Sequence, residues 1–458
     1  MMAMPLSEAA QALCADRTGA DVTFHGISTD SRKPMPGALF FALQGPNFDG
    51  HAFVDAARAQ GAAAAAVSRP CASDLPQLRV PDTRLALGRL AAHWRERFDI
   101  PVIGITGSNG KTTVRTMTAA ILARSGRVLA TQGNLNNDIG LPLTLARLDP
   151  ADAFAVIEMG ANHPGEIAYL TATAQPTIGV VTNAGPAHLE GFGDLEGVAH
   201  AKGELFAGLA PAGCAVINAD DTYAPLWREL AAHCRRVEFG LDHECEFGAR
   251  WDGDAAGSDI ELTTPAGGIT LHLPLPGRHN VMNALAATAA CWQAGVGADA
   301  IRAGLETLAP APGRFNLHRL PGDITLIDDT YNANPGSLAV AVDVLARAGG
   351  RTWLVLGDMG ELGAGAAALH RAAGVQARAA GITRLFGLGE LAQAAVAGFG
   401  AGGAAFDSLE QLLDGLRDDL HGPLHILVKG SRRMRMERVV DALCAVLQAG
   451  APISRGTH

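Results

Sequence analysis

One short stretch combines a lysine and two threonines with a glycine-rich loop. The apolar run 100–105 leads into Thr106-Gly-Ser-Asn-Gly-Lys-Thr-Thr113, and a helix-like run follows over 114–122. This order of strand, loop and helix is typical of a phosphate-binding loop, where backbone N–H groups and a helix N-terminus face an anion. Lys111 can reach the outer phosphates of a nucleotide, and the Thr112 hydroxyl can ligate Mg²⁺. The glycines, at 104, 107 and 110, depart from the strict Walker spacing, so an ordinary glycine turn is the alternative. The residues expected to bind nucleotide here are Gly107, Ser108, Asn109, Gly110, Lys111, Thr112 and Thr113.

Two possible metal ligands follow later apolar runs. Glu158 ends the run 154–157, and in a parallel sheet it would lie at the same edge as the glycine loop. It can ligate Mg²⁺ there, or it can simply cap the next loop. His188 lies in the glycine-rich loop 182–193, where it can be a second metal ligand or a structural histidine.

Lysine is rare in this chain. The four lysines are Lys33, Lys111, Lys202 and Lys429, and arginine supplies the rest of the 36 basic residues. A lysine that remains is therefore a candidate for chemistry that arginine cannot perform. Lys202 begins a helical run and can contact phosphate, or it can react with CO₂ to form a metal-ligating carbamate. The residues alone favour a surface lysine at this position.

Three polar stretches are candidates for binding a substrate. One turn separates two predicted strands of the first 82 residues, and a Gly/Pro/Asn loop follows the second of these strands. Ligands bind to such loops in α/β folds, although both stretches can also be solvated turns. An Asn-rich loop at 132–140 offers mixed donors and acceptors that can hold a peptide-like substrate or form a plain turn. The candidates are Thr29, Asp30, Ser31, Arg32, Asn47, Asn134, Asn136, Asn137 and Asp138.

Composition narrows the class of protein. The chain has 458 residues, of which 48% are hydrophobic, which is enough for several cores. The net charge of −10 argues against nucleic acid or an anionic membrane surface as the main partner. The seven cysteines are scattered, without a Cys-x-x-Cys pair, and indicate a reducing cytosol. No signal peptide or membrane-spanning stretch is expected, so we predict a cytoplasmic protein.

The alternation of apolar runs and helical patterns predicts an α/β fold with three domains. Residues 1–82 form a small α/β domain. Residues 83–312 form a doubly wound nucleotide-binding domain with a mainly parallel sheet, and a β-hairpin over 260–275 turns at Gly267-Gly268. A Pro/Gly break at 310–314 precedes a second, Rossmann-like α/β domain over 313–458.

The sequence resembles the Mur ligases of peptidoglycan synthesis over essentially its whole length. The glycine loop alone marks a wider superfamily that includes folylpolyglutamate synthase. The Asn-Leu-Asn-Asn-Asp and Asp-Asp-Thr-Tyr-Asn-Ala-Asn runs are more specific. The motifs are Thr29-Asp-Ser-Arg32, Thr106-Gly-Ser-Asn-Gly-Lys-Thr-Thr113, Gly133-Asn-Leu-Asn-Asn-Asp-Ile-Gly140, Glu158-Met-Gly-Ala-Asn-His163, Ala187-His-Leu-Glu-Gly-Phe-Gly193, Ala201-Lys-Gly-Glu204, Leu275-Pro-Gly-Arg-His-Asn280, Pro312-Gly-Arg314, Asp328-Asp-Thr-Tyr-Asn-Ala-Asn334, Gly357-Asp-Met-Gly-Glu-Leu-Gly363 and Lys429-Gly-Ser-Arg432.

The resemblance implies an activity and a division of labour. The first domain would bind a UDP-sugar (UDP-MurNAc), the second ATP, and the third the incoming amine. The implied reaction adds D-alanyl-D-alanine to UDP-N-acetylmuramoyl-tripeptide through an acyl phosphate, with ATP and two Mg²⁺ ions. The implied protein is a monomer that inserts into no membrane and binds no nucleic acid. The third residue of the tripeptide, diaminopimelate or lysine, stays open.

The resemblance also implies roles for single residues. Lys111 matches the phosphate-binding lysine, Thr112 and Glu158 match metal ligands, and His188 matches a ligand of a second metal. Lys202 matches the lysine that family members carry as a carbamate (N6-carboxylysine). Arg314 matches a phosphate-contacting arginine that domain closure delivers. Asn280, Asn283, Asp329 and Asn332 match nucleotide contacts, and Lys429 and Ser431 are assigned to substrate binding.

Two other functions remain to be separated from this one. One is a related ligase that adds a single amino acid, or folylpolyglutamate synthase. The other is a nucleotide-dependent switch, which would hydrolyse ATP without requiring an amine. Product formation with D-alanyl-D-alanine against single amino acids separates the ligases, and phosphate release that is independent of D-alanyl-D-alanine and tripeptide would indicate the switch.

Overall fold

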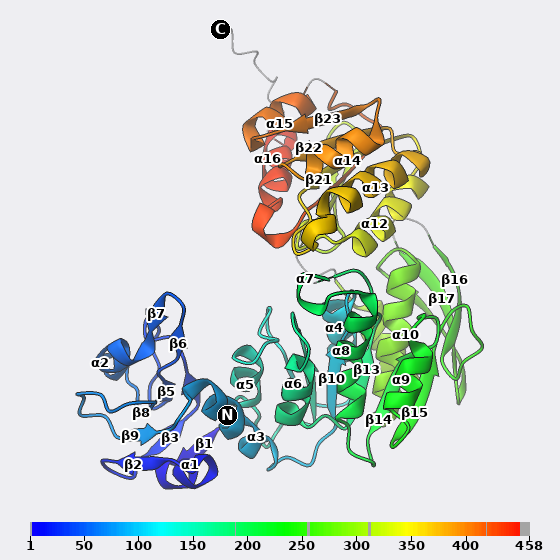
Figure 1. The fold of residues 1–458 in the computed structure, drawn as a ribbon. Helices are drawn as coiled ribbons and strands as arrows, with labels where there is room; N and C mark the ends of the chain where they lie inside the picture. The colour runs from blue at the N-terminus through cyan, green and yellow to red at the C-terminus, as the bar shows by residue number, and fades with distance from the viewer. Residues whose placement is uncertain (1, 188, 254–256, 310–312, 418, 449–458) are drawn as a thin grey trace.

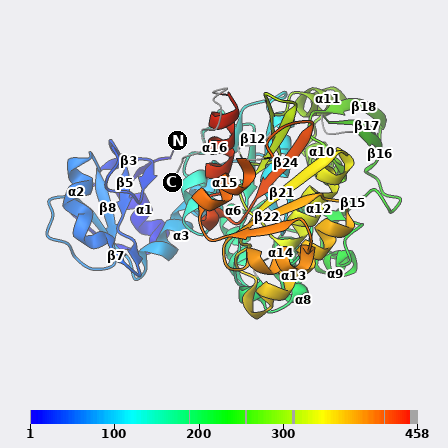
Figure 2. The ribbon, with the colours of Figure 1, turned by 90° about the horizontal axis from the view of Figure 1, so that it is seen from above.

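The chain folds into three α/β bodies that follow one another in sequence (Figure 1). The computed structural model describes residues 2–187, 189–253, 257–309, 313–417 and 419–448. The N-terminal body lies to one side of the central body, and the C-terminal body lies over it (Figures 1 and 2). The predicted α/β fold with three domains is confirmed.

The N-terminal body is built on a small mixed sheet with strand order β2-β9-β8-β5-β4, in which only β2 is antiparallel to its neighbour. The strands β5 and β8 are buried along their whole length because both faces of the sheet are covered. The elements are β1 (Ala3–Pro5), α1 (Leu6–Leu13), β2 (Asp16–Thr18), β3 (Thr23–His25), β4 (Ile27–Ser28), β5 (Leu39–Phe41), β6 (Gln44–Gly45), β7 (Phe48–Asp49), η1 (Gly50–Phe53), α2 (Val54–Ala59), β8 (Ala64–Val67) and β9 (Gln77–Arg79).

The central body contains a fully parallel six-stranded sheet with the order β11-β12-β10-β13-β14-β15. The strand that leads into the glycine loop, β10, is central and wholly buried. The elements are α3 (Thr83–Arg95), β10 (Val102–Thr106), α4 (Lys111–Leu122), β11 (Val128–Ala130), α5 (Gly140–Leu145), β12 (Phe154–Glu158), α6 (Glu166–Ala174), β13 (Ile178–Val181), α7 (Leu189–Phe192), α8 (Leu195–Ala207), β14 (Cys214–Asn218), α9 (Ala224–Leu230), β15 (Arg235–Phe239), α10 (Arg278–Gln293) and α11 (Ala298–Glu306).

A three-stranded antiparallel sheet, β16 (Gly248–Gly253), β17 (Ser258–Thr264) and β18 (Gly267–Leu273), covers one side of the central body. Alternate residues of β17 are buried, as expected for a sheet with one solvated face. The predicted hairpin is present, but its turn is not at Gly267-Gly268. These glycines pair with Thr264 and Thr263, so Pro265 and Ala266 make the turn.

The C-terminal body has a six-stranded sheet with the order β19-β20-β24-β21-β22-β23, in which only β19 is antiparallel. Helices cover both faces, which gives the sheet two separate apolar cores. The elements are β19 (Asn316–Leu320), β20 (Ile324–Asp329), α12 (Pro335–Arg347), β21 (Arg351–Gly357), η2 (Gly363–Gly365), α13 (Ala366–Ala379), β22 (Arg384–Leu388), α14 (Ala392–Phe399), β23 (Gly403–Phe406), α15 (Leu409–Arg417), β24 (Leu424–Lys429), η3 (Arg432–Met434) and α16 (Glu437–Gln448).

One apolar core joins the N-terminal body to the central body. It includes Leu6 and Leu13 of α1, Leu90 of α3, and Leu170 and Leu205 of the central helices. Helix α3 therefore lies against α5 and α6, and its first turn reaches the cavity that the glycine loop also lines. Among the described residues, no helix is both long and apolar enough to cross a membrane.

Candidate active site

The glycine loop between β10 and α4 is a tight turn that only glycine permits at two positions. Gly107 has φ +142°, and a Cβ there would lie 1.9 Å from Oγ1 of Thr182. Gly110 has φ +82° and directly precedes α4, whose first residue is Lys111. The loop therefore approaches β13 closely, and the backbone N–H groups of Ser108 and Asn109 donate to Asn183 at 3.0 Å, just before the N-terminus of α4.

Lys111 stands at the centre of this loop. Its Nζ donates to the carbonyl oxygens of Gly107 at 2.6 Å and Ser108 at 3.0 Å. Burial lowers the pKa of Lys111 to about 8, an effect that Glu158 opposes and Arg314 reinforces. A phosphate would restore a strong counter-charge to this ammonium, so the site favours an anionic ligand.

Glu158 lies at the end of β12, beside the loop, as the sequence predicted. Ile105 of β10 is its partner in the parallel ladder. The carboxylate, only 3% exposed, accepts the Thr112 hydroxyl at 3.0 Å and the Asn136 amide at 2.9 Å. It also lies 3.0 Å from Nη1 of Arg115. A buried carboxylate needs such partners, and a bound cation could replace one of these partners.

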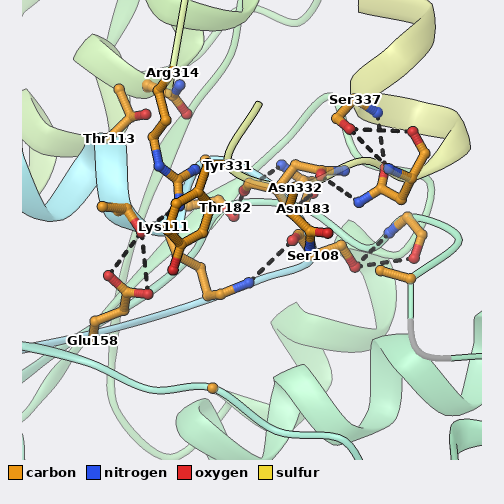
Figure 3. A pocket seen from close by; sticks show the side chains of 18 of the residues that line it. Ser108, Lys111, Thr113, Glu158, Thr182, Asn183, Arg314, Tyr331, Asn332 and Ser337 are labelled. Carbon is orange, nitrogen blue, oxygen red and sulfur yellow. Dashed lines mark hydrogen bonds between the residues drawn. The ribbon is translucent and has the colours of Figure 1, made fainter. Parts of the chain in front are cut away.

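An arginine from the C-terminal body also contacts Thr112. The Nη2 of Arg314 donates to Oγ1 of Thr112 at 3.0 Å, and its guanidinium lies 4.1 Å from the centre of the Tyr331 ring. Figure 3 shows Arg314 and Tyr331 side by side above Glu158. The Thr112 hydroxyl thus contacts both a carboxylate of the central body and a cation of the C-terminal body.

A second contact between the two bodies involves Asn109. Its backbone N–H donates to Oδ1 of Asn183 at 3.0 Å, and its carbonyl accepts from Thr182 at 2.6 Å. Its side-chain Oδ1 accepts from Nδ2 of Asn334 at 2.8 Å. Asn334 is also the N-cap of α12, where its Oδ1 accepts from the backbone N–H of Ser337 at 2.8 Å.

The predicted nucleoside contacts come from both bodies. Asn280 and Asn283 are buried on the first turns of α10, and Oδ1 of Asn283 is 2.4 Å from where a Cβ on Gly110 would lie. On the opposite body, Nζ of Lys429 contacts Asp329 at 2.5 Å and the carbonyl of Asn332 at 2.9 Å. These contacts hold two neighbouring strands, β20 and β24, together at their carboxyl ends.

These groups surround one cavity of about 1220 Å³. A ligand of nucleotide size fits such a volume. The predicted residues that line it are Ser108, Asn109, Gly110, Lys111, Thr112, Thr113, Asn134, Asn136, Asn137, Asp138, Glu158, Asn280, Asn283, Arg314, Asp329, Asn332, Lys429 and Ser431.

Other predicted residues lie elsewhere. Thr29, Asp30, Ser31 and Arg32 lie in the N-terminal body, where Nε of Arg32 is 2.8 Å from Oδ1 of Asp30, and do not line the cavity. Asn47 lies between β6 and β7, and it also stands apart from the cavity. His188 lies outside the described residues.

Lys202 is not the surface lysine that the residues alone favoured. It is 1% exposed on α8, and its Nζ lies 5.0 Å from the centre of the Phe192 ring. Burial lowers the pKa of Lys202 to about 7, with a further contribution from Lys111. It does not line the cavity. Burial thus favours the neutral form of this amine, which is the reactive form.

The oxygen donors near Lys111 suit Mg²⁺. Thr112 supplies a hydroxyl and Glu158 a carboxylate, which are hard ligands of the kind that this ion takes together with phosphates and waters. Within the described part of the chain, no cluster of three or more His, Cys, Asp or Glu residues could hold a metal by itself. The donor set fits an ion that arrives with a nucleotide.

Sequence reasoning missed several side chains that line the cavity or contact its lining residues. Arg115 lies one turn after Lys111, so its place beside Glu158 could have been inferred from helical spacing. Asn183 and Tyr331 each follow a strand, a position where ligand-binding residues are expected. Arg84 carries no such signal, because it comes from the first turn of α3, far from the loops in sequence.

Three family models match the chain in the same order as its three bodies. Residues 23–95 match "Mur ligase family, catalytic domain", residues 105–291 match "Mur ligase middle domain", and residues 313–443 match "Mur ligase, glutamate ligase domain". These ranges include the glycine loop and Arg314.

Full-length relatives are also similar to this chain. The UDP-N-acetylmuramoyl-tripeptide–D-alanyl-D-alanine ligase of Escherichia coli is 46% identical, over 97% of this chain and 99% of that protein. The solved structure of MurF from Acinetobacter baumannii has a TM-score of 0.93 and 36% identity, over 97% of this chain and 99% of that one. MurF ligase from Thermotoga maritima, solved with ADP, has a TM-score of 0.84 and 27% identity, over 93% and 99% of the two chains.

Proposed function

The chain belongs to the Mur ligase family, and from this premise we propose that it uses ATP to join D-alanyl-D-alanine to UDP-N-acetylmuramoyl-tripeptide. The product is the UDP-MurNAc-pentapeptide precursor of peptidoglycan. The observation that carries the proposal is the shared cavity, in which a phosphate-binding loop meets the Asn-rich loop and Arg314 of the C-terminal body. A switch protein would need the loop but not this convergence of three chain segments.

The first chemical step activates the peptide. An oxygen of the terminal tripeptide carboxylate attacks the γ-phosphorus of ATP, and the bond to the β-phosphate oxygen breaks, giving an acyl phosphate and ADP. Lys111 and the loop N–H groups hold the phosphates in line, while Arg314 balances the charge on the transferring group. Because substrate and ATP are both anionic, these cations also reduce the repulsion between them.

The second step forms the amide. The amine of D-alanyl-D-alanine attacks the acyl carbon, phosphate leaves, and the nitrogen loses a proton. The acyl phosphate must be shielded from water meanwhile, a role that we assign to the C-terminal body, which contacts Thr112 through Arg314 and Asn109 through Asn334. Lys429 and Ser431 lie on the C-terminal wall of the cavity and are the proposed contacts of the incoming dipeptide.

Thr112 and Glu158 are the proposed ligands of Mg²⁺, with a second ion assigned to His188 and Lys202. Bound with ATP, the ions would neutralise phosphate charge and favour phosphoryl transfer. The hydrogen bond from Asn136 and the ion pair with Arg115 would meanwhile fix the orientation of the Glu158 carboxylate.

Lys202 is the proposed site of carbamate formation. Its neutral amine can add to CO₂, forming a nitrogen–carbon bond and releasing one proton, which leaves a carboxylate at the end of the side chain. Two observations support this chemistry: the amine is almost fully buried, and its pKa is lowered to about 7. A carboxylate beside Lys111 would also balance the charge of that ammonium.

We assign the three domains as residues 1–82, 83–312 and 313–458. The first would hold the UDP-sugar through Thr29, Asp30, Ser31, Arg32 and Asn47, which places the nucleotide end of this long substrate outside the main cavity. The second binds ATP, and the third brings the dipeptide. A monomer contains every group that this scheme requires.

An amine-dependence assay tests the proposal. Phosphate release and pentapeptide formation are measured with ATP and the UDP-tripeptide, adding D-alanyl-D-alanine or a single amino acid. The expected result is coupled release and product formation with the dipeptide alone. Product with a single amino acid would indicate a different ligase, and phosphate release without any amine would indicate a nucleotide-dependent switch.

A further inference from the structure

An ion pair forms part of the cavity wall, and the reaction scheme above does not use it. Arg84, at the start of α3, contacts Asp138 of the Asn-rich loop through two hydrogen bonds, of which the Nη2–Oδ1 bond is 2.8 Å. Both residues line the cavity. The two side chains stay 53% and 31% exposed, so a ligand can reach each of them.

The pair is held by well-fixed backbone. Asp82 caps α3 by accepting from the backbone N–H groups of Arg84 at 2.7 Å and Leu85 at 3.0 Å. On the other side, Asn137 accepts from the N–H of Gly140 at 2.9 Å, which fixes the loop just before α5. A flexible surface ion pair would lack these constraints, whereas a recognition site benefits from them.

Covalent geometry brings one part of the substrate to this pair. The Asn136 amide contacts Glu158 at 2.9 Å, beside the loop where the reacting carboxylate must lie. Asp138 comes two residues later, so their Cα atoms are at most about 7.6 Å apart. The third peptide residue carries the reacting carboxylate on its own α-carbon, and a side chain of four or five bonds extends about 6 Å from there. The tip of that side chain can therefore reach Arg84 and Asp138.

Glu166, another carboxylate that lines the cavity, is less available to a ligand ammonium. Glu166 accepts from the N–H of Asn162 at 2.7 Å and lies 3.1 Å from the ring of His163. These contacts lower the pKa of Glu166 against the opposing effect of burial. Asp138, whose described side-chain partner is Arg84, is the better placed acid.

We propose that Arg84 and Asp138 together recognise a zwitterion at the end of the third residue's side chain, and so select a diaminopimelate-type tripeptide over a lysine-type one. The ligand carboxylate pairs with Arg84 and the ligand ammonium pairs with Asp138, so two charge pairs replace one. A lysine-type side chain offers only an ammonium. It would compete with Arg84 for Asp138 and leave the guanidinium without a partner, which disfavours binding.

This inference rests on the proposed function, and the assay separates the two. Initial rates are measured with UDP-MurNAc-tripeptide ending in diaminopimelate or in lysine, at saturating ATP and D-alanyl-D-alanine. The native enzyme is expected to favour the diaminopimelate peptide about tenfold or more in kcat/KM. The Arg84→Gln variant should lose most of this preference, through a higher KM for that peptide and a lower KM for the lysine peptide, whose ammonium no longer competes with the guanidinium for Asp138. Asp138→Asn should weaken binding of both peptides, because both carry the ammonium.

Two variants control for damage to the fold. Arg79→Gln breaks another ion pair, with Asp16 in the N-terminal body, and should leave both peptides unaffected. Arg84→Lys keeps a positive charge and should restore part of the preference. Equal use of the two peptides by the native enzyme, or equal losses for both in Arg84→Gln, would overturn the inference and make the pair a structural bridge. If neither peptide gave an amide product, the proposed function itself would fail.

Discussion

The side chain of Asn334 joins a helix cap of the C-terminal body to the phosphate-binding loop of the central body. Its Nδ2 donates to Oδ1 of Asn109 at 2.8 Å, while its Oδ1 accepts from the Ser337 N–H at 2.8 Å. One amide therefore performs two tasks, capping α12 and holding the loop. The contact exists only when the two bodies are close, so it is a candidate positioning contact for ATP.

The two tasks can be separated by substitution. Serine caps helices well but is too short to replace the amide donor, so Asn334→Ser should keep the stability of α12 and lose the link to Asn109. We expect KM for ATP to rise or kcat to fall about 3- to 10-fold, in line with one hydrogen bond of about 0.5–1.5 kcal/mol. Steady-state kinetics and the thermal unfolding midpoint measure the two effects separately.

Asn334→Ala is the matched comparison, because it removes the cap as well and should also lower the stability by about 1 kcal/mol. If the link matters, combining Asn334→Ser with Asn109→Ala should cost no more than Asn109→Ala alone. Fully additive losses would show that the two residues act independently.

Arg314 gives a second prediction about closure. It is stacked on Tyr331 and contacts Thr112, so we expect it to lie beside the transferring phosphate when ATP binds. We expect Arg314→Ala to lower kcat about 100-fold or more, since it removes a preorganised cation from the transition state. Tyr331→Phe keeps the ring and should stay near native, whereas Tyr331→Ala should lower kcat. A change confined to the KM of D-alanyl-D-alanine would instead assign Arg314 to dipeptide binding.

The fold and the placement of the glycine loop beside Glu158 could be predicted because their signals are local. Lys111 and Thr112 sit in a short stretch whose order of strand, loop and helix is visible in the sequence, and Glu158 follows from the parallel sheet. Short or polar strands gave no such signal. Three-residue β11 (Val128–Ala130) is too short to show a period, and β19 (Asn316–Leu320) contains asparagine, histidine and arginine.

Long-range contacts explain the rest. Arg84 and Asp138 are separated by 54 positions, and only the packing of α3 against the central helices brings them together. The residues alone favoured a surface position for Lys202, because lysines are rarely fully buried. The structure buries the side chain under Phe192, and a sequence pattern cannot show which face of a helix a tertiary contact covers.

Glu158 tests the magnesium assignment. Glu158→Gln keeps the shape of the side chain and can still accept from Thr112, but it removes the negative charge. We expect the Mg²⁺ concentration for half-maximal activity to rise about tenfold or more, with partial recovery at high Mg²⁺. Titrating activity with Mg²⁺ at fixed ATP measures this. An unchanged Mg²⁺ requirement together with a lower kcat would remove Glu158 from the ligand set.

Carbamate formation at Lys202 predicts chemical rescue. Lys202→Ala should lose most activity, and short carboxylates such as acetate should restore part of it, because they supply the missing negative group. Lys202→Arg is the control, since it fills the space with a cation and should respond to neither acetate nor bicarbonate. If acetate failed to raise the activity of Lys202→Ala while that variant kept its fold, the lysine would act as an amine rather than as a carbamate.

The lowered pKa of Lys202 also predicts how stability depends on pH. The folded state releases the proton near pH 7, whereas in the unfolded chain the ordinary value of 10.5 applies. Between these values the unfolded state holds more protons, so stability rises with pH by up to about 1.4 kcal/mol per unit from this group.

The substitution Lys202→Met removes the cost of burying the charge. Its stabilising effect should therefore be largest below about pH 7 and shrink toward pH 10. Thermal unfolding midpoints in CO₂-free buffer measure the difference, with Lys33→Met, an exposed lysine, as the control. A difference between Lys202→Met and native protein that stayed constant over this range would show that Lys202 remains protonated when buried, and would exclude it as the amine that adds CO₂.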